Sequence, residues 1–261
     1  MDLQIKGRVA LVCGAGSGLG QAMALTLAQE GVNVAVTGRN LEKLQATVGL
    51  IKDAGGEAQA WQLDLAGPQQ FDSVLNAIRQ HWGDIDILVN NSGGPPPAQA
   101  FGTDAALWQQ HFSLMVSSLI QLTDKVLPGM RQRGWGRIIT STSSGVIAPI
   151  PNLALSNALR MSLLGWSKTL ASEVAADGVT VNVLVPGRIA TDRVHQLDAI
   201  KAKREETTPE AISAQSRNQI PAKRYGTPQE YGAAAAFLAS QPASYITGTV
   251  LRVDGGMITS I

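Results

Sequence analysis

The sequence predicts an α/β fold in which helices cover both faces of a doubly wound parallel sheet of seven strands. Three observations predict it. Short apolar runs alternate with amphipathic stretches of helical length, no linker or repeat divides the 261 residues, and a glycine-rich turn follows the first apolar run. Strands that alternate with helices in this way are joined by right-handed crossovers, which make the sheet parallel. We therefore expect a single domain over residues 1–261.

The apolar runs predict the strands and the amphipathic stretches predict the helices. The strands are expected at residues 8–13, 32–37, 58–63, 85–89, 137–142, 179–185 and 249–253. The helices are expected at residues 18–30, 41–54, 68–82, 103–133, 152–176 and 228–240. Residues 186–227 break this rhythm with a polar stretch of mixed charge. Two interpretations stay open for it: a solvated helical insertion, or a mobile lid over a substrate cleft.

The composition excludes several classes of protein. The 21 Lys and Arg residues against 20 Asp and Glu residues leave a formal charge of +1, which argues against binding nucleic acid or a membrane surface through bulk charge. No apolar run approaches the roughly 18–20 residues of a membrane span, and no signal peptide is recognisable. The lone cysteine, Cys13, fits a reducing compartment, so we expect a cytoplasmic protein. The histidines and the cysteine show no metal-ligand spacing, so no metal site is expected.

The turn after the first strand has the composition of a phosphate cradle. Residues 13–20 read Cys-Gly-Ala-Gly-Ser-Gly-Leu-Gly and lead directly into a predicted helix. Glycines at such a turn let a phosphate approach the N–H groups of the helix N-terminus. The pattern therefore predicts a dinucleotide site that includes Gly14, Ser17, Gly18 and Leu19.

The end of the second strand bears on the choice of dinucleotide. An acidic residue there would accept hydrogen bonds from a ribose 2′-hydroxyl, but Gly38 and Arg39 occupy the position. A guanidinium suits a 2′-phosphate, although surface arginines are also common. Arg39 therefore favours NADP over NAD.

With this glycine spacing the chain resembles the short-chain dehydrogenase/reductase family, and within it the branch of 3-oxoacyl-acyl-carrier-protein reductases. Further motifs carry the resemblance along nearly the whole chain: Asp64-Leu65, Asn90-Asn91-Ser92-Gly93, Pro186-Gly187-Arg188-Ile189-Ala190-Thr191, Tyr245-Ile246-Thr247-Gly248 and Val253-Asp254-Gly255-Gly256. The resemblance implies a Rossmann fold with strand order 3-2-1-4-5-6-7. It also implies hydride transfer between NADP(H) and a carbonyl or alcohol, borne by a small molecule or an acyl thioester.

The resemblance also assigns roles to residues and suggests an assembly. Asp64 and Leu65 would contact the adenine. Asn91, Ser92 and Gly93 would line the cofactor groove after the fourth strand, and Pro186, Gly187, Ile189 and Thr191 would hold the nicotinamide carboxamide. The family further implies a homotetramer or dimer formed through the two long predicted helices.

This chain differs from the family at the positions of the catalytic residues. The family uses a Tyr, a Lys four residues later, a Ser thirteen residues before the Tyr, and an Asn on the preceding helix. An ungapped alignment places Leu155 at the Tyr, Leu159 at the Lys, Thr142 at the Ser and Met115 at the Asn. Tyr225, Tyr231 and Tyr245 are the only tyrosines, and none has a Lys four residues later. We therefore expect an apolar cleft in which Thr142 is the remaining catalytic residue, helped by water, Ser156 or His111.

These residues leave three functions open. The first is an NADP(H)-dependent oxidoreductase with a reorganised acid group, favoured by the nearly complete set of cofactor motifs. The second is a catalytically impaired NADP(H)-binding protein that acts as a sensor or partner subunit, suggested by the Leu155 and Leu159 pair. The third, supported only by Cys13 and Ser92, is a protein that has also lost nucleotide binding.

Overall fold

The computed structural model describes residues 1–260 and shows a parallel sheet of seven strands. The strands are β1 (Val9–Val12), β2 (Asn33–Gly38), β3 (Glu57–Gln62), β4 (Ile87–Asn90), β5 (Gly136–Ser141), β6 (Val179–Pro186) and β7 (Val250–Val253). Their order in the sheet is β3-β2-β1-β4-β5-β6-β7, which confirms the predicted fold and strand order. The order reverses between β1 and β4, so a crevice is expected at the carboxyl ends of these two strands.

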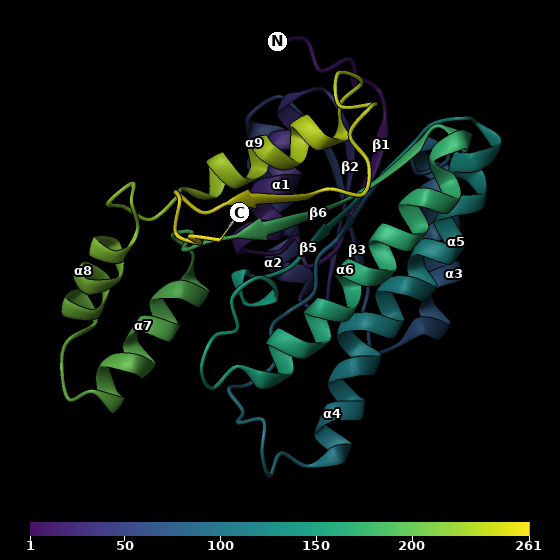
Figure 1. The fold of residues 1–261 in the computed structure, drawn as a ribbon. Coiled ribbons are helices and arrows are strands. Elements are labelled where there is room, and N and C mark those ends of the chain that lie inside the picture. The colour runs from purple at the N-terminus through teal and green to yellow at the C-terminus, as the bar shows by residue number, and fades with distance from the viewer. Residues whose placement is uncertain (261) are drawn as a thin grey trace.

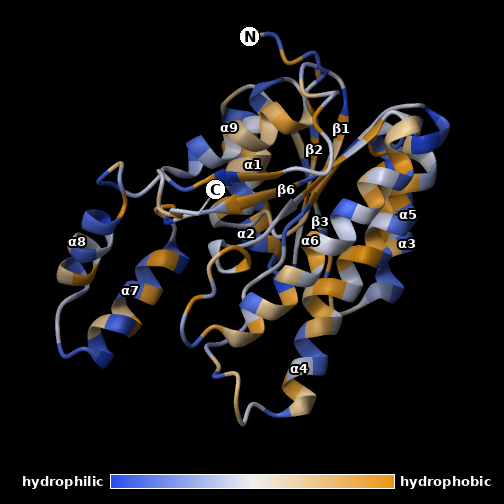
Figure 2. Ribbon diagram, in the orientation of Figure 1, coloured by the Kyte–Doolittle hydropathy of each residue, from blue (hydrophilic) through white to orange (hydrophobic). Residues whose placement is uncertain are grey.

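Two layers of helices enclose the sheet (Figure 1). One face carries α1 (Gly18–Gln29), α2 (Leu41–Asp53) and α9 (Pro228–Ala239), and the other carries α3 (Phe71–Trp82), α5 (Ser118–Gln132) and α6 (Ala154–Val174). Because both faces are covered, the central strands β1, β4 and β5 are buried over their whole length. Figure 2 shows hydrophobic colouring along β1, β2 and β6.

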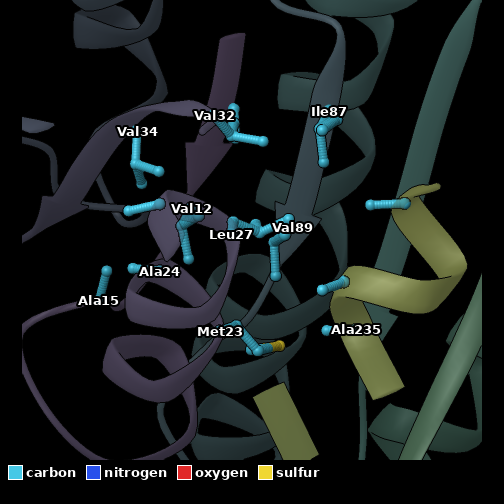
Figure 3. Packing of buried hydrophobic residues seen from close by; sticks show 14 of the residues in the cluster. Val12, Ala15, Met23, Ala24, Leu27, Val32, Val34, Ile87, Val89 and Ala235 are labelled. Atoms are coloured by element: carbon cyan, nitrogen blue, oxygen red, sulfur yellow. The ribbon is translucent and has the colours of Figure 1, made fainter. Parts of the chain in front are cut away.

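The core beneath α1 and α9 holds the glycine-rich turn in place. Met23 and Leu27 of α1 pack with Val12 of β1, Val89 of β4 and Ala235 of α9 (Figure 3). All five side chains are buried. A close-packed core of this kind resists local displacement, so the N-terminus of α1 has a defined position relative to the sheet.

The helix predicted over residues 103–133 is interrupted. The structure has α4 (Ala105–Phe112), a π-helical turn η2 (Ser113–Ser117) and then α5. A π-helical turn inserts a residue into the helical repeat and rotates the face that follows it. Sequence periodicity over 31 positions could not reveal this local insertion.

Residues 186–227 contain two helices, α7 (Asp192–Arg204) and α8 (Pro209–Gln219). They project away from the layered body beyond the end of β6 (Figure 1). Asp198 of α7 is buried and anchors this segment: Arg188 donates to it at 2.7 Å and the Tyr225 hydroxyl at 2.8 Å. These contacts fix the middle of α7 to Arg188, which follows β6, and to Tyr225.

Candidate functional site

The turn after β1 is shaped for close approach of a ligand to the backbone. Gly14 has a φ of +62°, a left-handed conformation that favours glycine. A Cβ at Gly20 would overlap the carbonyl oxygen of Gly14, so the first turn of α1 needs glycine there. Ser17, at the N-cap of α1, makes no side-chain capping bond, and the first turn has no acidic residue. The N–H groups at this end of α1 thus keep their capacity to bind a phosphate.

The turn after β1 lies against two other loops that carry sequence motifs. The Asn91 side chain donates to the carbonyl oxygen of Cys13 at 3.1 Å, which joins the end of β4 to the end of β1. A Cβ placed on Gly18 would lie 3.8 Å from Thr191, so the segment after β6 faces the start of α1. Pro186 ends β6, and the Gly187 N–H donates to Val253 of β7 at 2.9 Å. Ile189 is buried in the core beside α1.

The predicted 2′-phosphate end of the groove is a cavity of about 400 Å³ lined by Arg39, Gln62, Asp64 and Gln70. The Gln62 side chain donates to the Arg39 carbonyl oxygen at 2.8 Å and so fixes the backbone of that residue. Arg39 forms no ion pair with any carboxylate in residues 1–260. A free guanidinium at the rim of a cavity fits a phosphate, and the adjoining Asp64-Leu65 pair lies where the adenine is expected.

The two leucines assigned to the catalytic positions do not line a cleft. Leu155 is 0% exposed and Leu159 is 7% exposed, and both pack into an apolar cluster with Met115, Val116 and Leu119. This cluster joins α6 to η2 and α5. The expectation of an apolar catalytic cleft made by these leucines is therefore wrong.

The face of α6 that meets the strand ends carries Ser156 and Arg160 instead. The Arg160 guanidinium donates through Nη2 to the carbonyl oxygens of Ser92 at 3.0 Å and Gly93 at 3.3 Å, and through Nη1 to that of Ser141 at 3.3 Å. Positions i and i+4 share a helix face, so Ser156 lies one turn before Arg160 on the same side. Both side chains are buried.

Because Ser156 and Arg160 occupy this face, the alignment of α6 with the family's catalytic motif must be shifted by one residue. Ser156 stands at the Tyr position and Arg160 at the Lys position, and the residue thirteen before Ser156 is Ser143. Both spacings that the family requires are kept in either alignment, so spacing alone could not distinguish them. The identities could have done so, because the shifted alignment recovers a basic residue and a serine at two of the expected positions.

Thr142 and Ser143 differ in where their hydroxyls are directed. Thr142 is buried, and its Oγ1 donates to the Leu184 carbonyl oxygen at 3.3 Å. Ser143 is half-buried, and its Oγ accepts the Gly145 N–H at 3.2 Å, which leaves the hydroxyl hydrogen available to another acceptor. The geometry therefore favours Ser143 over the predicted Thr142 as the donor to a substrate oxygen.

The other candidate acid, His111, is not connected to this face. It lies on α4, and its buried Nδ1 has no hydrogen-bond partner among the described residues. Met115, at the Asn position, is buried in η2 and offers no hydrogen bond. The polar groups of the site thus come from β5 and α6.

Two pKa shifts describe the charge state of the site. Burial, with a contribution from the nearby Arg193, lowers the pKa of the Arg160 guanidinium to about 10, so it remains a cation at neutral pH. Burial raises the pKa of the Cys13 thiol to about 12. Cys13 is therefore a neutral core residue and not a nucleophile.

Residues 1–260 lack two further kinds of feature. No group of three His, Cys, Asp or Glu side chains is placed to hold a metal ion. No helix in this part of the chain combines the length and apolar character needed to span a bilayer.

The chain is similar to known reductases over nearly its whole length. The family described as enoyl-(acyl carrier protein) reductase matches residues 14–258. The 3-oxoacyl-[acyl-carrier-protein] reductase FabG of Escherichia coli (strain K12) is 37% identical over 257 residues, which are 98% of this chain and 99% of the relative. FabG of Vibrio cholerae serotype O1 is 36% identical with the same coverage. The solved structure of L-sorbose reductase from Gluconobacter frateurii, complexed with NADPH and L-sorbose, has a TM-score of 0.94 and 31% identity, and covers 100% of both chains.

Proposed function

The chain belongs to the short-chain dehydrogenase/reductase family, and on that premise we propose that it transfers a hydride between NADP(H) and a carbonyl or alcohol substrate. The observation that carries this proposal is the meeting of three loops around the start of α1: the Gly14 turn, the Asn91 turn and the segment that ends at Thr191. Dinucleotides bind at this place in doubly wound sheets. The substrate is a small carbonyl compound or an acyl thioester.

Several features support NADP(H) as the cofactor. Gly14, Ser17, Gly18 and Leu19 would hold the pyrophosphate, and Arg39 would pair with the 2′-phosphate in its cavity. Asp64 and Leu65 would contact the adenine. Around the nicotinamide, the holding residues would be Asn91, Ser92, Gly93, Pro186, Gly187, Ile189 and Thr191. L-Sorbose reductase, which shares this fold at a TM-score of 0.94, binds NADPH.

The catalytic role falls to side chains of the turn after β5 and of α6. When bound, the reduced nicotinamide supplies the hydride. Ser143 donates a hydrogen bond to the substrate oxygen, because its hydroxyl hydrogen is free of intramolecular acceptors. The Arg160 cation stabilises negative charge that develops there. Serine hydroxyls and water are both much weaker acids than a phenol, so the alkoxide that hydride transfer forms takes its proton from solvent through the Ser156 hydroxyl, while the Arg160 cation stabilises its charge.

The remaining expectations from the sequence concern setting and assembly. We infer that residues 186–227, with α7 and α8, form a lid over the substrate cleft, since they follow the carboxyl end of β6 and project from the body. We propose that the protein assembles as a homotetramer or dimer through α4, α5 and α6. We also propose that it is located in the cytoplasm.

Direct assay tests the proposal. NADPH consumption at 340 nm is followed with a panel of ketones and 3-oxoacyl thioesters, and binding is measured by the fluorescence of NADPH. We expect binding and slow turnover, and Arg39→Gln should weaken NADPH binding on the order of tenfold while leaving NADH binding unchanged. Arg217→Gln, an exposed arginine of α8, is the matched control. NADPH binding with no turnover on any substrate would instead assign the chain as a binding protein.

A further inference from the structure

A second arginine crosses the mouth of the site. Arg193 lies in the first turn of α7, which follows β6, and its Nη2 donates to the carbonyl oxygen of Pro95 at 3.3 Å. Pro95 belongs to the loop that follows β4. In the sheet β5 lies between β4 and β6, and all three strands are parallel. Arg193 therefore bridges the loops that follow β4 and β6, the two strands that flank β5.

Arg193 and Arg160 hold the same turn from two sides. Arg160 binds the carbonyl oxygens of Ser92 and Gly93, and Arg193 binds that of Pro95. A Cβ on Gly94, between them, would lie 3.6 Å from Nη2 of Arg193. The two guanidinium groups thus bind carbonyl oxygens within one four-residue turn, residues 92–95.

In the described residues 1–260, no carboxylate forms an ion pair with Arg160 or Arg193. The acidic groups of the neighbouring segments are committed elsewhere: Asp198 to Arg188 and Tyr225, and Glu230 to Arg224. Asp192, next to Arg193 in the chain, pairs with neither guanidinium. Two unpaired cations at the edge of a buried site favour an anion between or beside them.

The turn that the two arginines hold also contains an unused donor. The Ser92 hydroxyl is buried, with the residue 6% exposed, and has no hydrogen-bond partner in the protein. Buried hydroxyls without partners are uncommon because each costs desolvation free energy. A ligand or a water at this turn would satisfy it.

We propose that Arg193 is a specificity-determining residue that pairs with a carboxylate of the substrate, so that the enzyme acts on oxo acids and hydroxy acids. A guanidinium presents a planar pair of N–H donors that matches a carboxylate, and an exposed arginine held between the loops that flank β5 can turn toward one. Arg160 stays bound to its backbone acceptors and adds charge without moving. This inference rests on the proposed function of the same site.

The experiment compares matched substrates on wild type, Arg193→Gln and Arg193→Lys. Oxo acids of increasing chain length are assayed against their methyl esters, with a phosphorylated ketone to distinguish phosphate from carboxylate recognition. We expect a lower KM for the acids than for the esters, a rise in KM for the acids on the order of tenfold in Arg193→Gln, and partial recovery in Arg193→Lys. Arg204→Gln, at the other end of α7, is the control for charge and should leave the preference unchanged.

Four kinetic outcomes would overturn the inference, and the first three concern the acid–ester comparison and the cofactor. The first is equal KM values for acid and ester in the wild type, and the second is an equal change in the two KM values in Arg193→Gln. The third is a loss of NADPH affinity in that variant, which would assign Arg193 to the cofactor. Preference for the phosphorylated ketone over the oxo acids would also overturn it.

A binding measurement separates this inference from the proposed function. Oxo acids are titrated into the protein–NADP⁺ complex and followed by calorimetry, which needs no turnover. If no substrate of either class is reduced, the proposed function fails, yet weaker oxo-acid binding by Arg193→Gln than by wild type would still support the anion site. Equal binding by both proteins, or none by wild type, would overturn it.

Discussion

Nη2 of Arg160 lies 3.0 Å from the carbonyl oxygen of Ser92, and this bond ties the middle of the sheet edge to helix α6. The same guanidinium also reaches Gly93 and Ser141. One buried side chain therefore holds together the turn after β4, the end of β5 and α6. These are the elements that would surround a bound nicotinamide and its substrate.

Removal of this guanidinium should destabilise the protein. Arg160→Met leaves three carbonyl oxygens without their donor, two of them in buried bonds, and we expect the free energy of unfolding to fall by about 1–3 kcal/mol. Urea denaturation measures the change. Lys168→Met, on an exposed position of the same helix, is the control and should have little effect. An unchanged stability in Arg160→Met would contradict the structural role of these bonds.

The parallel α/β sheet was predictable from patterns that extend over many residues, whereas its strand order was implied by the family resemblance. Seven apolar runs, the glycine turn after the first and the helices between them admit few topologies. The alignment of α6 was not predictable in the same way. A shift of one residue preserves spacings of four and thirteen yet rotates the helix face by about 100°, and only the contacts of Leu155 and Arg160 decide between the two faces.

A pair of substitutions on β5 and the turn that follows it separates the predicted donor from the one that the geometry favours. Ser143→Ala should lower kcat on the order of a hundredfold, because it removes the free donor to the substrate oxygen. Thr142→Val should leave kcat little changed and lower the free energy of unfolding by about 1 kcal/mol, through the lost bond to Leu184. Steady-state kinetics and thermal unfolding measure both. The reverse order of effects on kcat would restore Thr142 as the catalytic residue.

Cys13 should report on folding through its pKa. Burial raises that pKa from 9.0 to about 12, so the native thiol stays protonated at pH 8.5 while the unfolded thiol begins to ionise. Across the window from about 9 to about 12 the native state holds a proton that the unfolded state has released, so this group makes the free energy of unfolding fall as pH rises.

Alkylation with iodoacetamide tests this shift, since the chain has one cysteine. At pH 8.5 we expect no labelling of the native protein and complete labelling in urea, both read by intact mass. Rapid labelling of the native protein at this pH would show that Cys13 is accessible and its pKa is not raised.

Rebuilding the family's acid at the correct face of α6 should increase ketone reduction. Ser156→Tyr combined with Arg160→Lys places a phenol and an ammonium on the face that meets Ser92 and Ser141, so turnover of NADPH with a ketone should rise above that of wild type. The matched control is Leu155→Tyr with Leu159→Lys. It places a phenol and a charge in the apolar cluster around Met115, so it should cost several kcal/mol of stability and add no activity. Turnover measured beside urea denaturation distinguishes the two, and a gain confined to the leucine pair would reverse the assignment of the catalytic face.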